Sequence, residues 1–265
     1  WLAANPQYFP NGVGVAVIQD GRLIFRRAYH GLDEQTPIPI ASSTKWISGL
    51  AIADAIVDPL IPQITTQTRI STSVQSFFDS VDDATGEPDK REITLAQAFA
   101  HLSGLPNEGV TNHHWNWAIT HEQAVDRIAE ESLIGPVGGQ IHYGGFGMHA
   151  AGLAVANALG TEWDAYARRT LFDPLGMAAT DYDAFTGEAF IPTENPNVAG
   201  SIRTTLDDYI TFLTMLNQQG RFAGEQVVRK DAIDVLLTDY AGPDVLIDRS
   251  PYPKYQFFVP GAADF

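Results

Sequence analysis

Cysteine is absent from the 265-residue sequence, so disulfides and thiolate metal sites are excluded. The sequence also lacks a run of about 18 apolar residues, the length typical of a membrane-spanning helix, and we expect no membrane partner. No methionine, charged leader or apolar signal segment precedes Trp1, so we expect a processed or trimmed product. A cysteine-free chain fits an exported bacterial protein, and we expect a periplasmic or extracellular location.

Basic residues are scarce: 16 Lys and Arg stand against 32 Asp and Glu, which gives a net charge of −16. A surface of this kind repels nucleic acids and anionic membranes, and no basic stripe reverses the balance, so we expect no nucleic-acid partner. Hydrophobic residues make up 45% of the chain and charged residues 18%. This composition predicts one large globular domain or two subdomains that share a cleft.

Apolar periodicity and turn residues predict the secondary structure. Asp20-Gly21 between two apolar runs predicts an antiparallel hairpin over residues 13–25. Thr94 predicts the cap of a helix that ends at Leu102, before the turn Ser103-Gly104-Leu105-Pro106. The predicted helices cover residues 74–78, 94–102, 122–131, 148–159, 163–171, 205–219 and 230–237.

The stretch Ser42-Ser43-Thr44-Lys45 is the centre of the functional prediction. Prolines just before it predict an extended lead-in, and the apolar spacing after it predicts a helix that begins near Ser42. Residues three apart lie on one face of a helix, so Ser42 and Lys45 can touch. A serine beside a lysine at a helix start is suited to act as a nucleophile with its proton acceptor. The alternative is that Ser42 is an N-cap and Lys45 a solvated side chain.

Two polar clusters allow a metal-binding interpretation and a simpler one. His113 and His114 lack a third partner at metal-site spacing, so we favour an aromatic pocket mouth lined by Trp115 and Trp117. An acidic group lacks the ligand spacing of a calcium loop, so we favour a solvated surface loop. That group comprises Asp79, Asp82, Asp83, Glu87 and Asp89.

Several segments resemble, in the same order, the motifs of class C β-lactamases, D-alanyl-D-alanine carboxypeptidases and their esterase relatives. They are the nucleophile motif (40–45), a helix and turn (93–106), a tyrosine followed by a helix (143–159), a structural turn (174–177) and a re-entry segment (199–209). The resemblance covers roughly residues 12–237. Each piece is weak alone, and their shared order carries the resemblance.

The resemblance implies an α+β fold of the β-lactamase/transpeptidase-like class. An antiparallel sheet flanked by helices forms one subdomain, predicted over residues 1–59 and 200–265. A mostly helical subdomain is predicted over residues 60–199, with the active site between the two. The family's third motif, a strand that supplies an oxyanion donor, is not found in the sequence. We therefore expect an incomplete sheet that a missing C-terminal segment completes, either a part trimmed from this chain or a separate C-terminal fragment of the same protein.

The resemblance also implies the roles of the site residues. Ser42 is the acylated nucleophile, Lys45 its neighbour and Tyr143 the proton shuttle, with no metal and no organic cofactor. A lysine cation beside a phenol favours the phenolate, and such a pair can take a proton from serine. His142 is an alternative base, although neighbours in an extended stretch usually face apart.

The family's second motif is tyrosine, a small residue and then asparagine, whose side chain holds the amide of a β-lactam or peptide. Here Gly145 stands in the place of that asparagine. This favours an esterase acting on a small-molecule ester or amide, and the glycine either gives space for a bulky acyl group or forms a tight turn. The alternatives are a β-lactamase or D-alanyl-D-alanine carboxypeptidase, and a non-catalytic binding module on the same fold.

Overall fold

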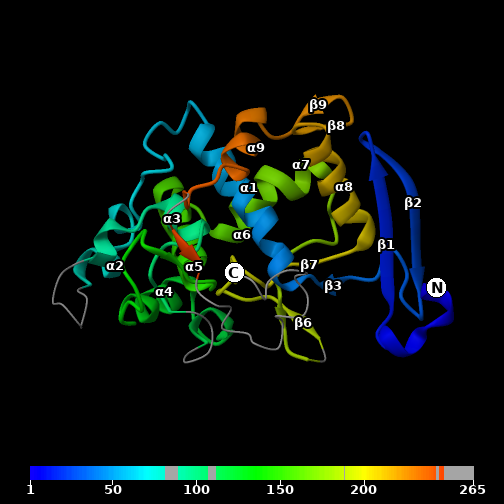
Figure 1. Cartoon of the computed structure of the whole chain (residues 1–265), viewed down its shortest axis with the longest axis horizontal. Coiled ribbons are helices and arrows are strands. Elements are labelled where there is room, and N and C mark those ends of the chain that lie inside the picture. Colours follow the sequence, from blue (N-terminus) through cyan, green and yellow to red (C-terminus); the bar gives the residue numbers. More distant parts are fainter. Residues whose placement is uncertain (81–88, 107–111, 188, 243–244, 248–265) are drawn as a thin grey trace. The chain divides into compact units, whose positions relative to one another are not determined.

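The computed structural model describes residues 1–80, 89–106, 112–187, 189–242 and 245–247 (Figure 1). The chain divides into two compact units. Unit 1 comprises residues 1–57, 164–192 and 200–237, and unit 2 comprises residues 58–163, 193–199 and 238–265. Residues 164–192 thus belong to unit 1, whereas the sequence had placed them with the helical middle.

Unit 1 begins with two short 3₁₀ turns and a long antiparallel hairpin. Strands β1 (Val13–Gln19) and β2 (Arg22–Tyr29) confirm the predicted hairpin. Asp20 and Gly21 both have positive φ angles, 49° and 71°, which suits a tight turn that matches the twist of the strands. Within the described residues, no further strand is hydrogen-bonded to this pair. Helix α8 (Leu206–Asn217) packs against β1.

The core of unit 1 lies around helix α1 (Thr44–Val57), in which Ile47, Leu50 and Ala51 have no exposed surface. Helix α9 (Lys230–Leu236) packs against α1, and the two lie side by side in Figure 1. The remaining elements of unit 1 are short. They are η1 (Leu2–Ala4), η2 (Pro6–Tyr8), β3 (Ile38–Pro39), η3 (Ala41–Ser43), η7 (Arg168–Phe172), α7 (Asp173–Leu175), β5 (Ala184–Phe185), β6 (Phe190–Ile191), β7 (Arg203–Thr204), β8 (Arg221–Phe222) and β9 (Glu225–Gln226).

Unit 2 is built around helix α5 (Phe146–Leu159), which is buried over its first eleven residues, Phe146 to Ala156. The short helices α3 (Leu95–Phe99) and α4 (His121–Ala129) both pack against α5. Gly160 ends α5 in the left-handed conformation, at φ 63°, as the sequence predicts. The other elements of unit 2 are η4 (Ile70–Thr72), α2 (Gln75–Asp79), η5 (Asp89–Glu92), η6 (His113–Trp115), β4 (Gln140–Ile141) and β10 (Leu246–Ile247), and α6 (Trp163–Ala167) runs from unit 2 into unit 1.

Two predicted helix ends are corrected by the structure. The helix capped by Thr94 ends at Phe99 and not at Leu102, because His101 takes the left-handed position that reverses the chain. The predicted helix over residues 163–171 is α-helical only to Ala167 and continues as the π-helical turn η7. None of the helices in the described part of the chain combines the length and the apolar character needed to span a membrane.

Candidate active site

Ser42 and Lys45 touch, as their spacing predicts. The Nζ atom of Lys45 donates a hydrogen bond to Oγ of Ser42 over 3.0 Å. Ser42 is exposed and Lys45 is half-buried. An accessible hydroxyl in contact with an amine is the arrangement that a serine nucleophile needs.

Backbone geometry holds Ser42 at this position. Ala41, just before it, has a φ of 45°, a left-handed conformation that is strained for alanine. Residues on both sides of the turn are tied to Ile202: Ile40 N donates to Ile202 O over 2.9 Å, and Ile202 N donates to Thr44 Oγ1 over 3.1 Å. The turn η3 therefore connects an anchored strand to an anchored helix, and helix α1 begins two residues after Ser42.

Tyr143 belongs to unit 2 and precedes the start of α5. Its ring lies against the imidazole of His101, with ring centroids 4.5 Å apart. The next residue, Gly144, donates its N–H to Nδ1 of His101 over 3.3 Å. Sequence reasoning missed His101. The sequence feature that could have identified His101 is its place directly after a short capped helix, where the chain has to reverse.

His142, the alternative base, is buried in unit 2. A Cβ atom built on Gly135 would lie only 2.7 Å from Nε2 of His142, so the imidazole packs against that glycine backbone. Gly145, a predicted substrate contact, is buried and is the N-cap of α5. Because glycine has no side chain, Gly145 offers a substrate no side-chain amide.

The predicted aromatic residues share one loop of unit 2. Trp115 and Trp117 are half-buried and meet edge to face, with ring centroids 5.5 Å apart. The amide Nδ2 of Asn195 donates to two carbonyl oxygens of this loop, those of His113 and Asn116, each over 3.1 Å. These two hydrogen bonds fix the loop to Asn195, a residue that sequence reasoning did not single out.

Histidines lie in the core of unit 2. His114, His121 and His149 are all buried, and the rings of His121 and His149 lie 4.2 Å apart. Burial lowers the pKa of His121 to about 4. Burial, followed by repulsion from His121 and His114, lowers the pKa of His149 well below its usual range. No group of three or more potential metal ligands is assembled in the ranges that the structure describes.

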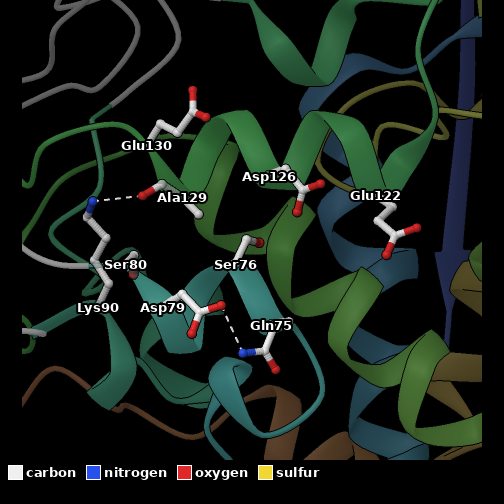
Figure 2. A pocket seen from close by; sticks show the side chains of 9 residues that line it. All are labelled: Gln75, Ser76, Asp79, Ser80, Lys90, Glu122, Asp126, Ala129 and Glu130. Atoms are coloured by element: carbon white, nitrogen blue, oxygen red, sulfur yellow. Dashed lines mark hydrogen bonds between the residues drawn. The ribbon is translucent and has the colours of Figure 1, made fainter.

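Unit 2 also has an acidic hollow with a volume of about 800 Å³ (Figure 2). Its lining comprises Gln75, Ser76, Asp79, Ser80, Lys90, Glu122, Asp126, Ala129 and Glu130. Lys90 is 1% exposed and donates from Nζ to the carbonyl oxygen of Ala129 over 2.8 Å. Asp79 accepts a hydrogen bond from Gln75 over 2.9 Å. Of the predicted acidic cluster, Asp82, Asp83 and Glu87 lie outside the described residues.

Comparison with known sequences identifies the family. The sequence model of the family described as Beta-lactamase matches residues 7–249. The chain therefore belongs to the Beta-lactamase family and has the β-lactamase/transpeptidase-like fold, with helices and small antiparallel sheets. This fold family includes serine hydrolases and esterases.

Individual relatives are distant. Beta-lactamase-like protein 2 of Dictyostelium discoideum is 24% identical over 180 residues, which are 63% of this chain and 32% of that protein. The chain thus spans about a third of the length of this relative.

Solved structures share the fold. A putative beta-lactamase from Bacteroides dorei DSM 17855 matches with a TM-score of 0.78 and 22% identity, over 97% of this chain and 73% of that one. EstCE1, described as a hydrolase with promiscuous acyltransferase activity, matches with a TM-score of 0.71 and 14% identity, over 88% of this chain and 74% of that one. At these identities the likeness establishes the fold alone.

Proposed function

We propose that the protein is a serine hydrolase that cleaves carboxylic esters through an acyl-enzyme on Ser42. The observation that carries this proposal is the 3.0 Å contact between Lys45 Nζ and Ser42 Oγ. Serine is a weak nucleophile unless a neighbouring group activates it, and Lys45 is such a neighbour. Membership of the Beta-lactamase family supports the same chemistry. The role of Tyr143 is assigned from the motif order of the family.

The proposed reaction has two stages. Ser42 Oγ attacks the carbonyl carbon of the ester, its proton passes to the phenolate oxygen of Tyr143, and the cation of Lys45 stabilises the charge that develops on Oγ. The tetrahedral intermediate then collapses, the bond to the leaving alcohol breaks, and Tyr143 gives the proton to that alcohol. In the second stage, water attacks the acyl group by the same route, which releases the carboxylic acid and restores the Ser42 hydroxyl.

The proposed substrate class rests on Gly145. An amide substrate needs a group that holds its amide, and Gly145 has no side chain to do so. An ester needs no such contact. The likeness to EstCE1, a hydrolase with promiscuous acyltransferase activity, supports acyl transfer, in which an alcohol takes the place of water and forms a new ester.

Hydrolysis of p-nitrophenyl butyrate and labelling by a fluorophosphonate test this proposal. Ser42→Ala should abolish both, with a loss of about 10⁴-fold or more in turnover. The matched control is Ser43→Ala, because Ser43 is the neighbouring serine and is hydrogen-bonded to Tyr209 instead. Full turnover by Ser42→Ala would refute the acyl-enzyme. Faster cleavage of a chromogenic cephalosporin than of simple esters would refute the substrate class and favour a β-lactamase.

A further inference from the structure

The residue that reverses the chain after helix α3 is a histidine in a conformation that suits glycine. His101 has a φ of 60°. The Leu102 N–H donates to Gln97 O over 2.8 Å, the six-residue hydrogen bond of a Schellman turn. Glycine fits this left-handed position without strain, whereas a residue with a Cβ atom costs free energy there. A strained residue of this kind raises the question of what its side chain contributes.

His101 contacts three consecutive residues around the proposed proton shuttle. Its carbonyl oxygen accepts from His142 N–H over 2.8 Å, and its Nδ1 accepts from Gly144 N–H over 3.3 Å. Between these two hydrogen bonds, its ring lies against the ring of Tyr143 at 4.5 Å, with the planes 40° apart. The backbone before Tyr143, the backbone after it and its side chain are therefore all held by one residue.

The left-handed backbone makes this triple contact possible. It turns the chain so that the carbonyl and the imidazole of His101 both face the segment 142–144. Because Nδ1 accepts a hydrogen bond, the neutral ring carries its proton on Nε2. The small residue Gly144 lets its N–H approach the imidazole, and helices α3 and α5, which flank the two segments, pack together.

We propose that His101 is a positioning residue that fixes the orientation of the Tyr143 phenol for acyl transfer. The inference rests on the proposed role of Tyr143 in that reaction. A proton shuttle has to meet the reacting oxygen within hydrogen-bonding distance, and a displacement of about 1 Å can reduce the rate by roughly 10²-fold. The ring of His101 and its two hydrogen bonds restrict Tyr143 to one geometry before any substrate arrives.

The test uses His101→Gly, His101→Asn, Tyr143→Phe and the double variant His101→Gly/Tyr143→Phe in the full chain. Glycine suits a φ of 60°, so loss of folding is not the expected result, and a thermal melt checks this. We expect His101→Gly to lower kcat for p-nitrophenyl butyrate by roughly 10- to 100-fold with KM little changed. Asparagine tolerates the left-handed conformation and offers an acceptor oxygen, so His101→Asn should recover part of the rate.

The double variant distinguishes an effect on the position of Tyr143 from a general disturbance of the structure. If His101 acts through Tyr143, His101→Gly should have little further effect once Tyr143 is phenylalanine. Full additivity of the two changes, or a wild-type rate for His101→Gly beside a slowed Tyr143→Phe, would overturn this inference alone. A wild-type rate for Tyr143→Phe would instead show that the reaction does not need Tyr143. That result would refute both the role of Tyr143 as proton shuttle and this inference.

Discussion

The Nε2 atom of His149 lies 2.9 Å from Oδ1 of Asn195, although 46 residues separate the two in the sequence. Neither side chain has exposed surface. The carbonyl oxygen of His149 in turn accepts from Nε2 of His121 over 2.9 Å. Both imidazoles therefore carry a proton on Nε2, and the amide of Asn195 connects them to the loop that bears Trp115 and Trp117.

This buried pair makes unit 2 sensitive to acid. The pKa of His121 is lowered to about 4 from 6.5, and that of His149 is lowered well below its usual range, in both cases mainly by burial. The unfolded chain therefore binds protons near pH 6.5 while the folded chain does not, so the free energy of unfolding falls as the pH falls below about 6.5. For His121 the loss approaches roughly 3 kcal/mol near pH 4.

Hydrogen exchange of the α5 amides at pH 7.5 and pH 5.0, corrected for the intrinsic exchange rates, measures this loss within unit 2. Protection should decrease at the lower pH. His149→Gln keeps an amide donor for Asn195 but does not titrate, so its protection should depend less on pH. An equal pH dependence in the variant and the wild type would contradict this explanation.

Replacing Lys45 by methionine should slow the labelling of Ser42 by a fluorophosphonate roughly 10²- to 10⁴-fold. Methionine keeps the length of the side chain and removes the hydrogen bond to Ser42 Oγ. Because Lys45 is only half-buried, the melting temperature should change little. Normal labelling of Lys45→Met would show that the contact with Ser42 is structural.

Ala41→Gly should raise stability and lower reactivity. Relief of the left-handed strain at Ala41 should add up to about 1 kcal/mol. The added backbone freedom should slow labelling of Ser42 by roughly three- to tenfold. The matched control is Ala223→Gly, since Ala223 has a similar φ of 50° and lies in the turn between β8 and β9. Ala223→Gly should gain stability while its labelling rate stays unchanged. Equal labelling rates for the two variants would refute the effect of the Ala41 backbone on Ser42.

Lys90→Met should lower the stability of unit 2 by about 1–3 kcal/mol. The ammonium of Lys90 binds the carbonyl of Ala129 in the last turn of α4, where the helix dipole also favours a cation (Figure 2). Lys230→Met is the control, because Lys230 is exposed at the start of α9 and should contribute less than about 0.5 kcal/mol. Urea unfolding of both variants measures the two losses of stability. Equal unfolding midpoints would contradict a stabilising role of Lys90 at the end of α4.

The features predicted correctly from the sequence are those set by neighbours in the chain. Asp20-Gly21 determines the hairpin through local backbone preference, and both residues take the positive φ angles that such a turn requires. Thr94 caps its helix by accepting from Gln97 N, three residues away. The contact between Ser42 and Lys45 follows from helical spacing in the same way.

The features missed depend on the three-dimensional structure or on an unusual residue. The sequence predicts Gly104 as the C-cap of helix α3 because glycine is the usual left-handed residue, whereas His101 is the left-handed residue that ends this helix. The bond between Asn195 and His149 has no local signal, since it forms only when distant segments pack together. Strand β3 contains two residues, too few to show an alternating pattern.

The order in which the chain leaves the ribosome has a consequence for Asn195. Most of unit 2 is one continuous segment, residues 58–163, whereas the short segment 193–199 joins it only after about thirty residues of unit 1 have been made. Until Asn195 has been made, the Nε2–H of His149 lacks the amide oxygen that accepts its hydrogen bond, and the Trp115 loop lacks its hydrogen bonds to Asn195. The hydrogen bonds of Asn195 are therefore added to unit 2 late in synthesis, before residues 238–265 of the same unit follow.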